Sequence, residues 1–146
     1  MKFSKKEIPE IIQKIIVKLL KMNKSGARVI AFSGDLGAGK TTLTQELARQ
    51  LGIRETIVSP TFVIMKFYDI DPISKYFSNF KKLIHIDAYR LDSHEELLNI
   101  GWESLKVNKS NLIILEWPER VPECISDLDL KITLSHVDED NRCIEF

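Results

Sequence analysis

The sequence predicts an α/β fold, a three-layer sandwich in which helices enclose a largely parallel central sheet. Three observations lead to this prediction. Strands alternate with helices in the first half, two strands in the middle are almost entirely apolar, and β-rich sequence follows. The chain has 146 residues, enough for one domain with a substantial core. We therefore expect a single domain over residues 1–146.

The first expected element is an amphipathic helix over residues 8–20, where isoleucine and leucine recur at helical spacing between lysines. Ser4 and Glu7 have the spacing of a capping box. Pro9 lacks a backbone N–H and fits only the first turn of a helix. We expect the helix to begin near Glu7.

The other expected helices and strands follow along the chain. In order they are a strand over 28–33, a helix over 40–51 stopped by Gly52, a strand over 61–68, a loop over 69–80, a strand over 83–87, a helix from Ser93 interrupted at Gly101, a strand over 111–117 and a closing hairpin around 138–141. Two of the apolar strands end in carboxylates, Asp87 and Glu116.

The stretch GDLGAGKTT, residues 34–42, matches the phosphate-binding pattern G-x-x-x-x-G-K-[ST] between a strand and a helix. Its glycines let the backbone aim N–H groups inward, where they and the helix N-terminus bind phosphate. Lys40 places a cation between the β- and γ-phosphates, Thr41 coordinates Mg²⁺, and Thr42 reaches the α-phosphate. The expected nucleotide contacts of this loop are Gly37, Ala38, Gly39, Lys40, Thr41 and Thr42. The fold class is therefore that of P-loop NTPases.

A P-loop site also needs an acid that holds Mg²⁺ or its water shell. Asp87 and Glu116 both qualify, because each follows a run of mostly apolar strand residues. The pattern does not choose between them.

Two other nucleotide-dependent classes fit less well. A GTPase would carry Asn-Lys-x-Asp after a strand, whereas NKSN at 108–111 ends in Asn and precedes a strand. A small-molecule kinase would need an arginine-bearing lid, but the arginines are scattered. We therefore expect ATP.

The composition bears on which partners the protein binds and on the cellular compartment in which it works. Lys+Arg and Asp+Glu both number 21, so the basic surplus typical of nucleic-acid-binding proteins is missing. No apolar run is long enough to span a bilayer, and we expect no membrane association. Cys124 and Cys143 have no metal-ligand spacing and are expected to be free thiols in a reducing compartment. These features predict a cytoplasmic protein.

Four blocks in order give the chain a specific resemblance: GDLGAGKTT at 34–42, SPTF at 59–62, HIDAYRL at 85–91 and LEWPER at 115–120. Together they resemble the bacterial TsaE (YjeE) proteins over nearly the whole chain. The resemblance implies a P-loop ATPase required for threonylcarbamoyladenosine synthesis at position 37 of tRNA. It implies binding to a TsaB–TsaD heterodimer, with tRNA reached indirectly through that complex. Alone, the chain is expected to be a monomer or to self-associate weakly.

The same resemblance implies roles for the acids. Glu116 matches the family's Mg²⁺-linked glutamate and would act with Thr41. Asp87 matches a second acid near the γ-phosphate, which would position water or serve the outer shell of the metal. The expected catalytic residues are Lys40, Asp87 and Glu116.

Further residues are expected around the nucleotide. Ser59 and Thr61 form a switch segment whose hydroxyls approach Mg²⁺ or the γ-phosphate, and Arg142 lies where the family places a basic residue near the closing strand. His85 faces the same side of its strand as Asp87 and is interpreted as a packing or hydrogen-bonding residue. Trp117 is expected to point to the opposite face from Glu116.

Two rival functions remain at this level. One is a stand-alone small-molecule or protein kinase, which would phosphorylate a product without partners. The other is a nucleotide-gated binding module, for which binding without turnover would suffice.

Overall fold

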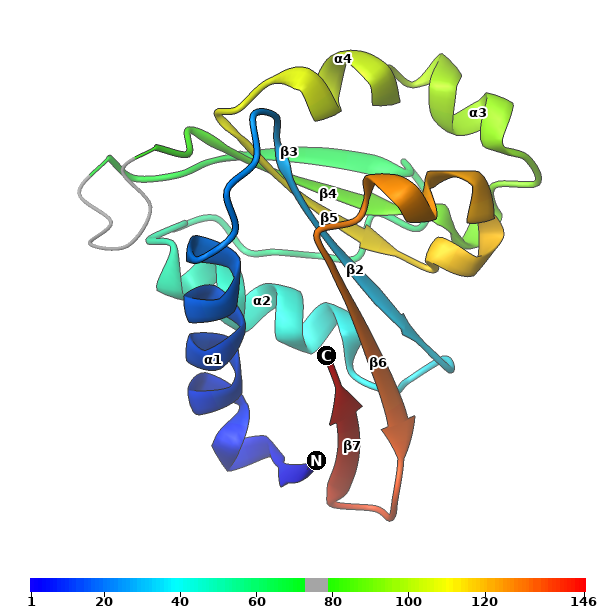
Figure 1. The fold of residues 1–146 in the computed structure, drawn as a ribbon. Coiled ribbons are helices and arrows are strands. Elements are labelled where there is room, and N and C mark those ends of the chain that lie inside the picture. The colour runs from blue at the N-terminus through cyan, green and yellow to red at the C-terminus, as the bar shows by residue number, and fades with distance from the viewer. Residues whose placement is uncertain (73–78) are drawn as a thin grey trace.

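The computed structural model describes residues 1–72 and 79–146, and within them one mixed sheet of seven strands runs in the order β1-β7-β6-β2-β5-β4-β3 (Figure 1). The strands are β1 (Lys2–Ser4), β2 (Arg28–Gly34), β3 (Met65–Asp69), β4 (Lys82–Asp87), β5 (Asn111–Glu116), β6 (Leu130–His136) and β7 (Asn141–Glu145). The α-helices are α1 (Ile8–Leu20), α2 (Lys40–Gln50), α3 (His94–Asn99) and α4 (Trp102–Val107).

The centre of this sheet is parallel and its margins are antiparallel. β2 pairs in parallel with β5 and β6, and β5 pairs in parallel with β4. β3, β7 and β1 add antiparallel pairings outside this core. The expected α/β architecture is confirmed, with the parallel part confined to the four central strands.

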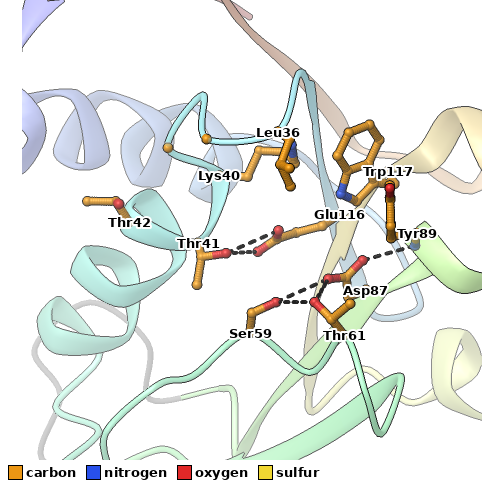
Figure 2. Close-up of a pocket in the computed structure, with 12 residues that line it drawn as sticks. Leu36, Lys40, Thr41, Thr42, Ser59, Thr61, Asp87, Tyr89, Glu116 and Trp117 are labelled. Carbon is orange, nitrogen blue, oxygen red and sulfur yellow. Dashed lines mark hydrogen bonds between the residues drawn. The ribbon is translucent and has the colours of Figure 1, made fainter. Parts of the chain in front are cut away.

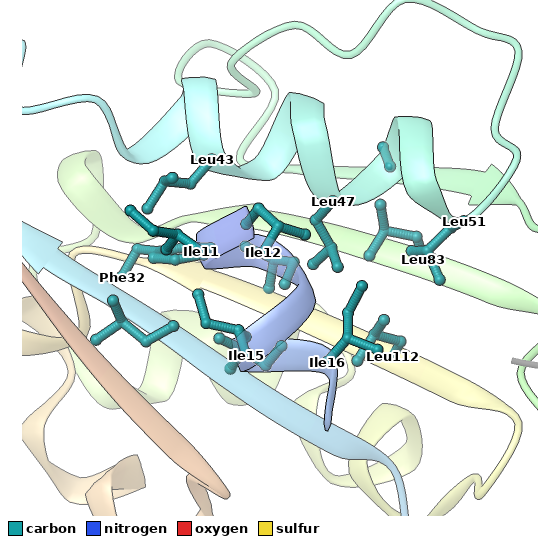
Figure 3. Packing of buried hydrophobic residues seen from close by; sticks show 14 of the residues in the cluster. Ile11, Ile12, Ile15, Ile16, Phe32, Leu43, Leu47, Leu51, Leu83 and Leu112 are labelled. Atoms are coloured by element: carbon teal, nitrogen blue, oxygen red, sulfur yellow. The ribbon is translucent and has the colours of Figure 1, made fainter. Parts of the chain in front are cut away.

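Helices cover both faces of the sheet, which makes the three layers (Figure 1). α1 and α2 pack on one face, where Ile12, Ile15 and Leu47 are fully buried against strand residues such as Phe32 (Figure 3). On the other face, the fully buried Trp102 and its neighbours pack against the second set of alternating strand residues. Each central strand therefore buries both its faces, as the apolar runs predicted.

The start of the chain differs from the expectation in one respect. Ser4 donates its backbone N–H to the Glu7 carboxylate at 2.8 Å, so the expected capping contact forms, over a 3-10 turn at Lys5–Glu7. α1 begins at Ile8 with Pro9 in its first turn, as expected. β1, which pairs with β7, was not expected from the sequence. Three residues are too few to show strand alternation.

The strand expected over 61–68 is wrong at its beginning. The Pro60 carbonyl accepts hydrogen bonds from the N–H groups of Val63 and Ile64, which makes residues 61–63 a turn. Ile64 has φ 67°, a left-handed conformation outside the extended β region. β3 begins only at Met65.

The remaining elements agree closely with the prediction. Gly52 follows α2 with φ 79°, and Gly101 separates α3 from α4 with φ 96°. The backbone N–H of Ile70 bonds to the Lys81 carbonyl, so the excursion between β3 and β4 closes on itself, although its residues 73–78 lie outside the described part. β6 and β7 form the expected hairpin.

The expectations about membrane-spanning segments and cysteines concern the whole chain. Within the described residues, no helix is both long enough and apolar enough to cross a membrane. Cys124 and Cys143 are both free thiols, and burial raises the pKa of Cys124 to about 11.

Candidate nucleotide-binding site

The phosphate loop lies between β2 and α2, and glycine geometry fixes its course. Gly34 has φ 137°, and a side-chain carbon there would lie 2.3 Å from the carbonyl oxygen of Leu134 on β6. Gly39 has φ 105° and immediately precedes α2. The first N–H groups of α2 have no partner within the helix, so they are available to an anion.

Lys40 is almost fully buried at the start of α2, with 5% of its surface exposed. Its ammonium donates to the carbonyl oxygens of Gly34 at 2.6 Å and Asp35 at 2.9 Å. Burial lowers the pKa of Lys40, and nearby carboxylates, led by that of Glu116, act in the opposite direction. The Lys40 ammonium is therefore held against the backbone of the phosphate loop.

Glu116 meets the loop from the end of β5. The Thr41 hydroxyl lies 3.2 and 3.3 Å from the two carboxylate oxygens of Glu116, which is 2% exposed (Figure 2). Strand alternation explains the meeting, since Leu112, Ile114 and Glu116 share the face that α1 and α2 cover. Thr41 and Glu116 were both expected at the metal, and the fold brings them together.

Asp87 lies beside Glu116, because the two residues are registered partners on β4 and β5. The hydroxyls of Ser59 and Thr61 lie 3.1 and 2.7 Å from its Oδ2, and the backbone N–H of Tyr89 donates to its Oδ1 at 2.9 Å (Figure 2). The carboxylate thus ties the segment at 59–61 to the sheet. Asp87 itself is 3% exposed.

These groups surround a cavity of about 260 Å³ above the phosphate loop. Most of the residues expected at the nucleotide line it. They are Gly37, Gly39, Lys40, Thr41, Thr42, Thr61, Asp87 and Glu116.

Ala38 and Arg142 line a second cavity, of about 190 Å³, on the other side of the loop. Gly37, Gly39 and Thr42 border both cavities, so the two are neighbours across the phosphate loop. The Arg142 guanidinium donates to carbonyls of the β6–β7 turn, including that of Asp138 at 2.8 Å. Arg142 therefore belongs to this second cavity.

Phe3, Lys5 and Ile8, which form one wall of the second cavity, were not named from the sequence. Phe3 comes from β1, which pairs with β7 and thereby brings the first residues beside Arg142. The amphipathic pattern showed only that Ile8 would be buried. Nothing in the local sequence indicates that a three-residue strand closes a cavity.

Trp117 meets its expectation only in part. Its side chain packs against the buried cluster on the face opposite Glu116, as expected. Its φ of 60° ends β5 at Glu116, however, so the ring does not follow strand alternation and also reaches the phosphate loop. The ring centroid lies 3.8 Å from the Lys40 ammonium and 5.0 Å from the Tyr89 ring. Trp117 thus lines the cavity above the phosphate loop.

Comparison with known proteins identifies the family. Residues 4–144 match the family described as "Threonylcarbamoyl adenosine biosynthesis protein TsaE". The chain belongs to the TsaE family. This confirms the resemblance carried by the four sequence blocks.

Individual TsaE relatives agree. The TsaE protein of Nostoc sp. is 38% identical over 130 residues, which cover 87% of this chain and 74% of the relative. That of Bacillus subtilis is 32% identical over 133 residues, covering 91% and 77%. Among solved structures, Bacillus subtilis YdiB is 28% identical and superimposes with a TM-score of 0.61, covering 99% of this chain and 82% of the other.

The donors in this TsaE-family site fit a magnesium ion bound together with a nucleotide. Thr41 and Glu116 offer a hydroxyl and a carboxylate, the oxygen ligands that Mg²⁺ prefers. Within residues 1–72 and 79–146, no cluster of three or more His, Cys, Asp or Glu residues could hold a metal alone. A hydrated Mg²⁺ that shares phosphate oxygens needs no such cluster.

Proposed function

We propose that this TsaE-family chain is an ATP hydrolase that supports threonylcarbamoyl modification of tRNA adenosine 37 together with a TsaB–TsaD type heterodimer. One observation carries the proposal. Glu116 and Asp87 end adjacent parallel strands and face the same cavity as Lys40 and Thr41 of the phosphate loop. A pair of acids beside a phosphate loop is suited to phosphoryl transfer from a metal-bound nucleotide.

Each group has a distinct task in this proposal. Lys40 and the N-terminal amides of α2 would bind the phosphates. The Thr41 hydroxyl and Glu116 would hold Mg²⁺, which would neutralise phosphate charge. Asp87 accepts a proton from, or orients, the attacking water. In this proposal the Thr61 hydroxyl, which lies 2.7 Å from Oδ2 of Asp87, exchanges that contact for one near the γ-phosphate.

We propose the second cavity as the binding site for the base of the nucleotide. Phe3 and Ile8 supply apolar surface, and Arg142 and Lys5 border it with positive charge. Gly37 and Gly39 line both cavities. One nucleotide would therefore extend from the second cavity across the phosphate loop to Asp87 and Glu116. The choice of ATP over GTP rests on the sequence, which lacks a guanine-reading motif.

The chain alone should hydrolyse ATP slowly. No arginine is among the described residues that line the cavity above the loop. Arg120 donates instead to the Tyr89 carbonyl, and Arg90 lies over the Phe62 ring. An arginine that reaches the transferring phosphate accelerates hydrolysis by about 10³–10⁵ in other P-loop enzymes. We propose that the partner complex completes or reorders the site.

The test combines ATP hydrolysis with multi-turnover tRNA modification, each measured with and without the partner heterodimer. We expect hydrolysis to rise with the partners, and both Lys40→Ala and Glu116→Ala to abolish ATP-dependent turnover. An unaffected modification cycle in either variant would contradict the mechanism.

The same assay addresses both rivals. A phosphorylated product formed from ATP without partners would support a kinase. Repeated modification with a non-hydrolysable ATP analogue would support a binding module whose hydrolysis is incidental.

A further inference from the structure

His85 is a fully buried side chain on β4, two residues before Asp87. Its Nε2 lies 2.7 Å from Oε1 of Glu116. It thus contacts the proposed metal-binding carboxylate from behind, because it is not among the residues that line the cavity above the phosphate loop.

The two ring nitrogens of His85 have very different surroundings. An ionised carboxylate only accepts hydrogen bonds, so with Glu116 ionised the Nε2–H of His85 is the donor. Its Nδ1 is buried and has no hydrogen-bond partner among the described residues. A leucine or methionine would fill the same space without burying an unpartnered nitrogen. Packing alone therefore does not account for a histidine here, whereas the bond to Glu116 does.

The hydrogen bond from His85 gives the two carboxylate oxygens of Glu116 different surroundings. Oε1 accepts from His85 at 2.7 Å, while the Thr41 hydroxyl lies at 3.2 Å from Oε1 and 3.3 Å from Oε2. The short contact fixes the rotation of the carboxylate about its last side-chain bond. Oε2 has no contact with His85 and lies 3.3 Å from the Thr41 hydroxyl.

We propose that His85 is a positioning residue, which holds Glu116 in the orientation that serves the Mg²⁺ of the bound nucleotide. The inference rests on the proposed function in one respect, namely that Glu116 serves Mg²⁺. Groups that orient metal-linked side chains typically change metal affinity by 10–100-fold, roughly, when they are removed. The effect of His85 should therefore appear in the metal dependence of nucleotide binding.

The test compares two substitutions of similar length. In His85→Gln, an amide N–H can occupy the place of Nε2 and donate to Glu116, whereas His85→Met fills the space without a donor. ADP binding is measured by calorimetry on the purified chain, once in EDTA and once in Mg²⁺. The ratio of the two dissociation constants gives the gain in affinity due to the metal.

We expect binding in EDTA to stay within about twofold of the unsubstituted chain in both variants. We expect His85→Met to reduce the metal-dependent gain by about tenfold or more, and His85→Gln to retain most of it. In a Glu116→Gln background, the same substitutions should have no further effect on the gain. A merely structural histidine would instead alter binding in EDTA and Mg²⁺ alike.

Three results would overturn the proposal: a full metal-dependent gain in His85→Met, equal losses in both variants, or an undiminished effect in the Glu116→Gln background. If thermal melting shows that His85→Met does not fold, His85→Asn replaces it, since its shorter amide cannot reach Glu116. This assay needs neither tRNA nor a partner. Failure of the modification assay would therefore leave its outcome unaffected, and the two proposals can fail separately.

Discussion

Trp117 has a backbone conformation that is unfavourable for its side chain. A residue other than glycine in the left-handed region costs about 1–2 kcal/mol. The backbone N–H of Trp117 donates to the Phe32 carbonyl at 3.1 Å, which helps to hold that conformation. The result is that an indole ring lies against the Lys40 ammonium. An attraction of this kind contributes about 0.5–2 kcal/mol.

This contact predicts an optical signal for nucleotide binding. Phosphates should compete with the ring for the Lys40 ammonium, so ATP should change the emission of Trp117. The chain contains two tryptophans, and the other, Trp102, is fully buried on the far face of the sheet. Titration of a Trp102→Phe variant with ATP should show the change.

The matched control for that titration is Lys40→Ala in the same Trp102→Phe background, which should show none of the change. A signal of equal size in the Lys40→Ala chain would refute the competition between phosphate and ring.

Single residues of this site were predictable where a local pattern determines them. The phosphate-loop motif gave Lys40 and Thr41, and strand ends gave Asp87 and Glu116. The cavity contact of Trp117 was not predicted, because strand alternation ends with β5 at Glu116, although its packing against the opposite face was expected. The pairing of His85 with Glu116 joins two strands, so neither strand's sequence could reveal it.

At the scale of elements, the segment from Ser59 to Ile64 is the least regular part of the site. The sequence predicted a strand from Thr61, since the residues there are apolar and partly β-branched. Two hydroxyl contacts to Asp87 and two backbone bonds to the Pro60 carbonyl override that propensity. β-propensity is a weak guide where such tertiary contacts compete.

Besides its proposed role toward the attacking water, Asp87 should therefore control how well ordered residues 59–64 are. In Asp87→Ala we expect faster amide hydrogen exchange over residues 59–64, measured by mass spectrometry, because both hydroxyls lose their bond to the carboxylate on β4. Partner-stimulated ATP hydrolysis should fall by about 10²–10⁴, the range for a lost general base.

Ser59→Ala is the matched control for Asp87→Ala. It keeps the shorter Thr61 contact and should show a smaller rise in exchange. Unchanged exchange in Asp87→Ala would mean that the segment is ordered by other contacts.

At the scale of the whole molecule, the stability of the site depends on the layer formed by α1 and α2. Ile15 is fully buried between these helices and the sheet, whereas Val17 on the same helix is 49% exposed. Ile15→Ala should lower the free energy of unfolding by about 2–5 kcal/mol. Val17→Ala should change it by less than about 0.5 kcal/mol, as is usual for surface positions.

Urea denaturation of the two variants measures this difference. Equal losses of stability would contradict the burial of Ile15 in the core.

The architecture was more predictable than the site because it follows from periodicity summed over many residues. Apolar runs at 83–87 and 111–117 indicated a covered parallel sheet, and this is confirmed. The β6–β7 hairpin was expected, but the pairing of β1 with β7 was harder to foresee, since it joins residues at opposite ends of the sequence.

That pairing has a consequence for the order of events during synthesis. Phe3 and Lys5 leave the ribosome before the phosphate loop, and Asp140 and Arg142 leave it long after that loop, yet all four line one cavity. A nascent chain that has already made its phosphate loop would still lack this wall. If the base binds in this cavity, as proposed, full nucleotide affinity should therefore appear only after the β6–β7 hairpin has formed.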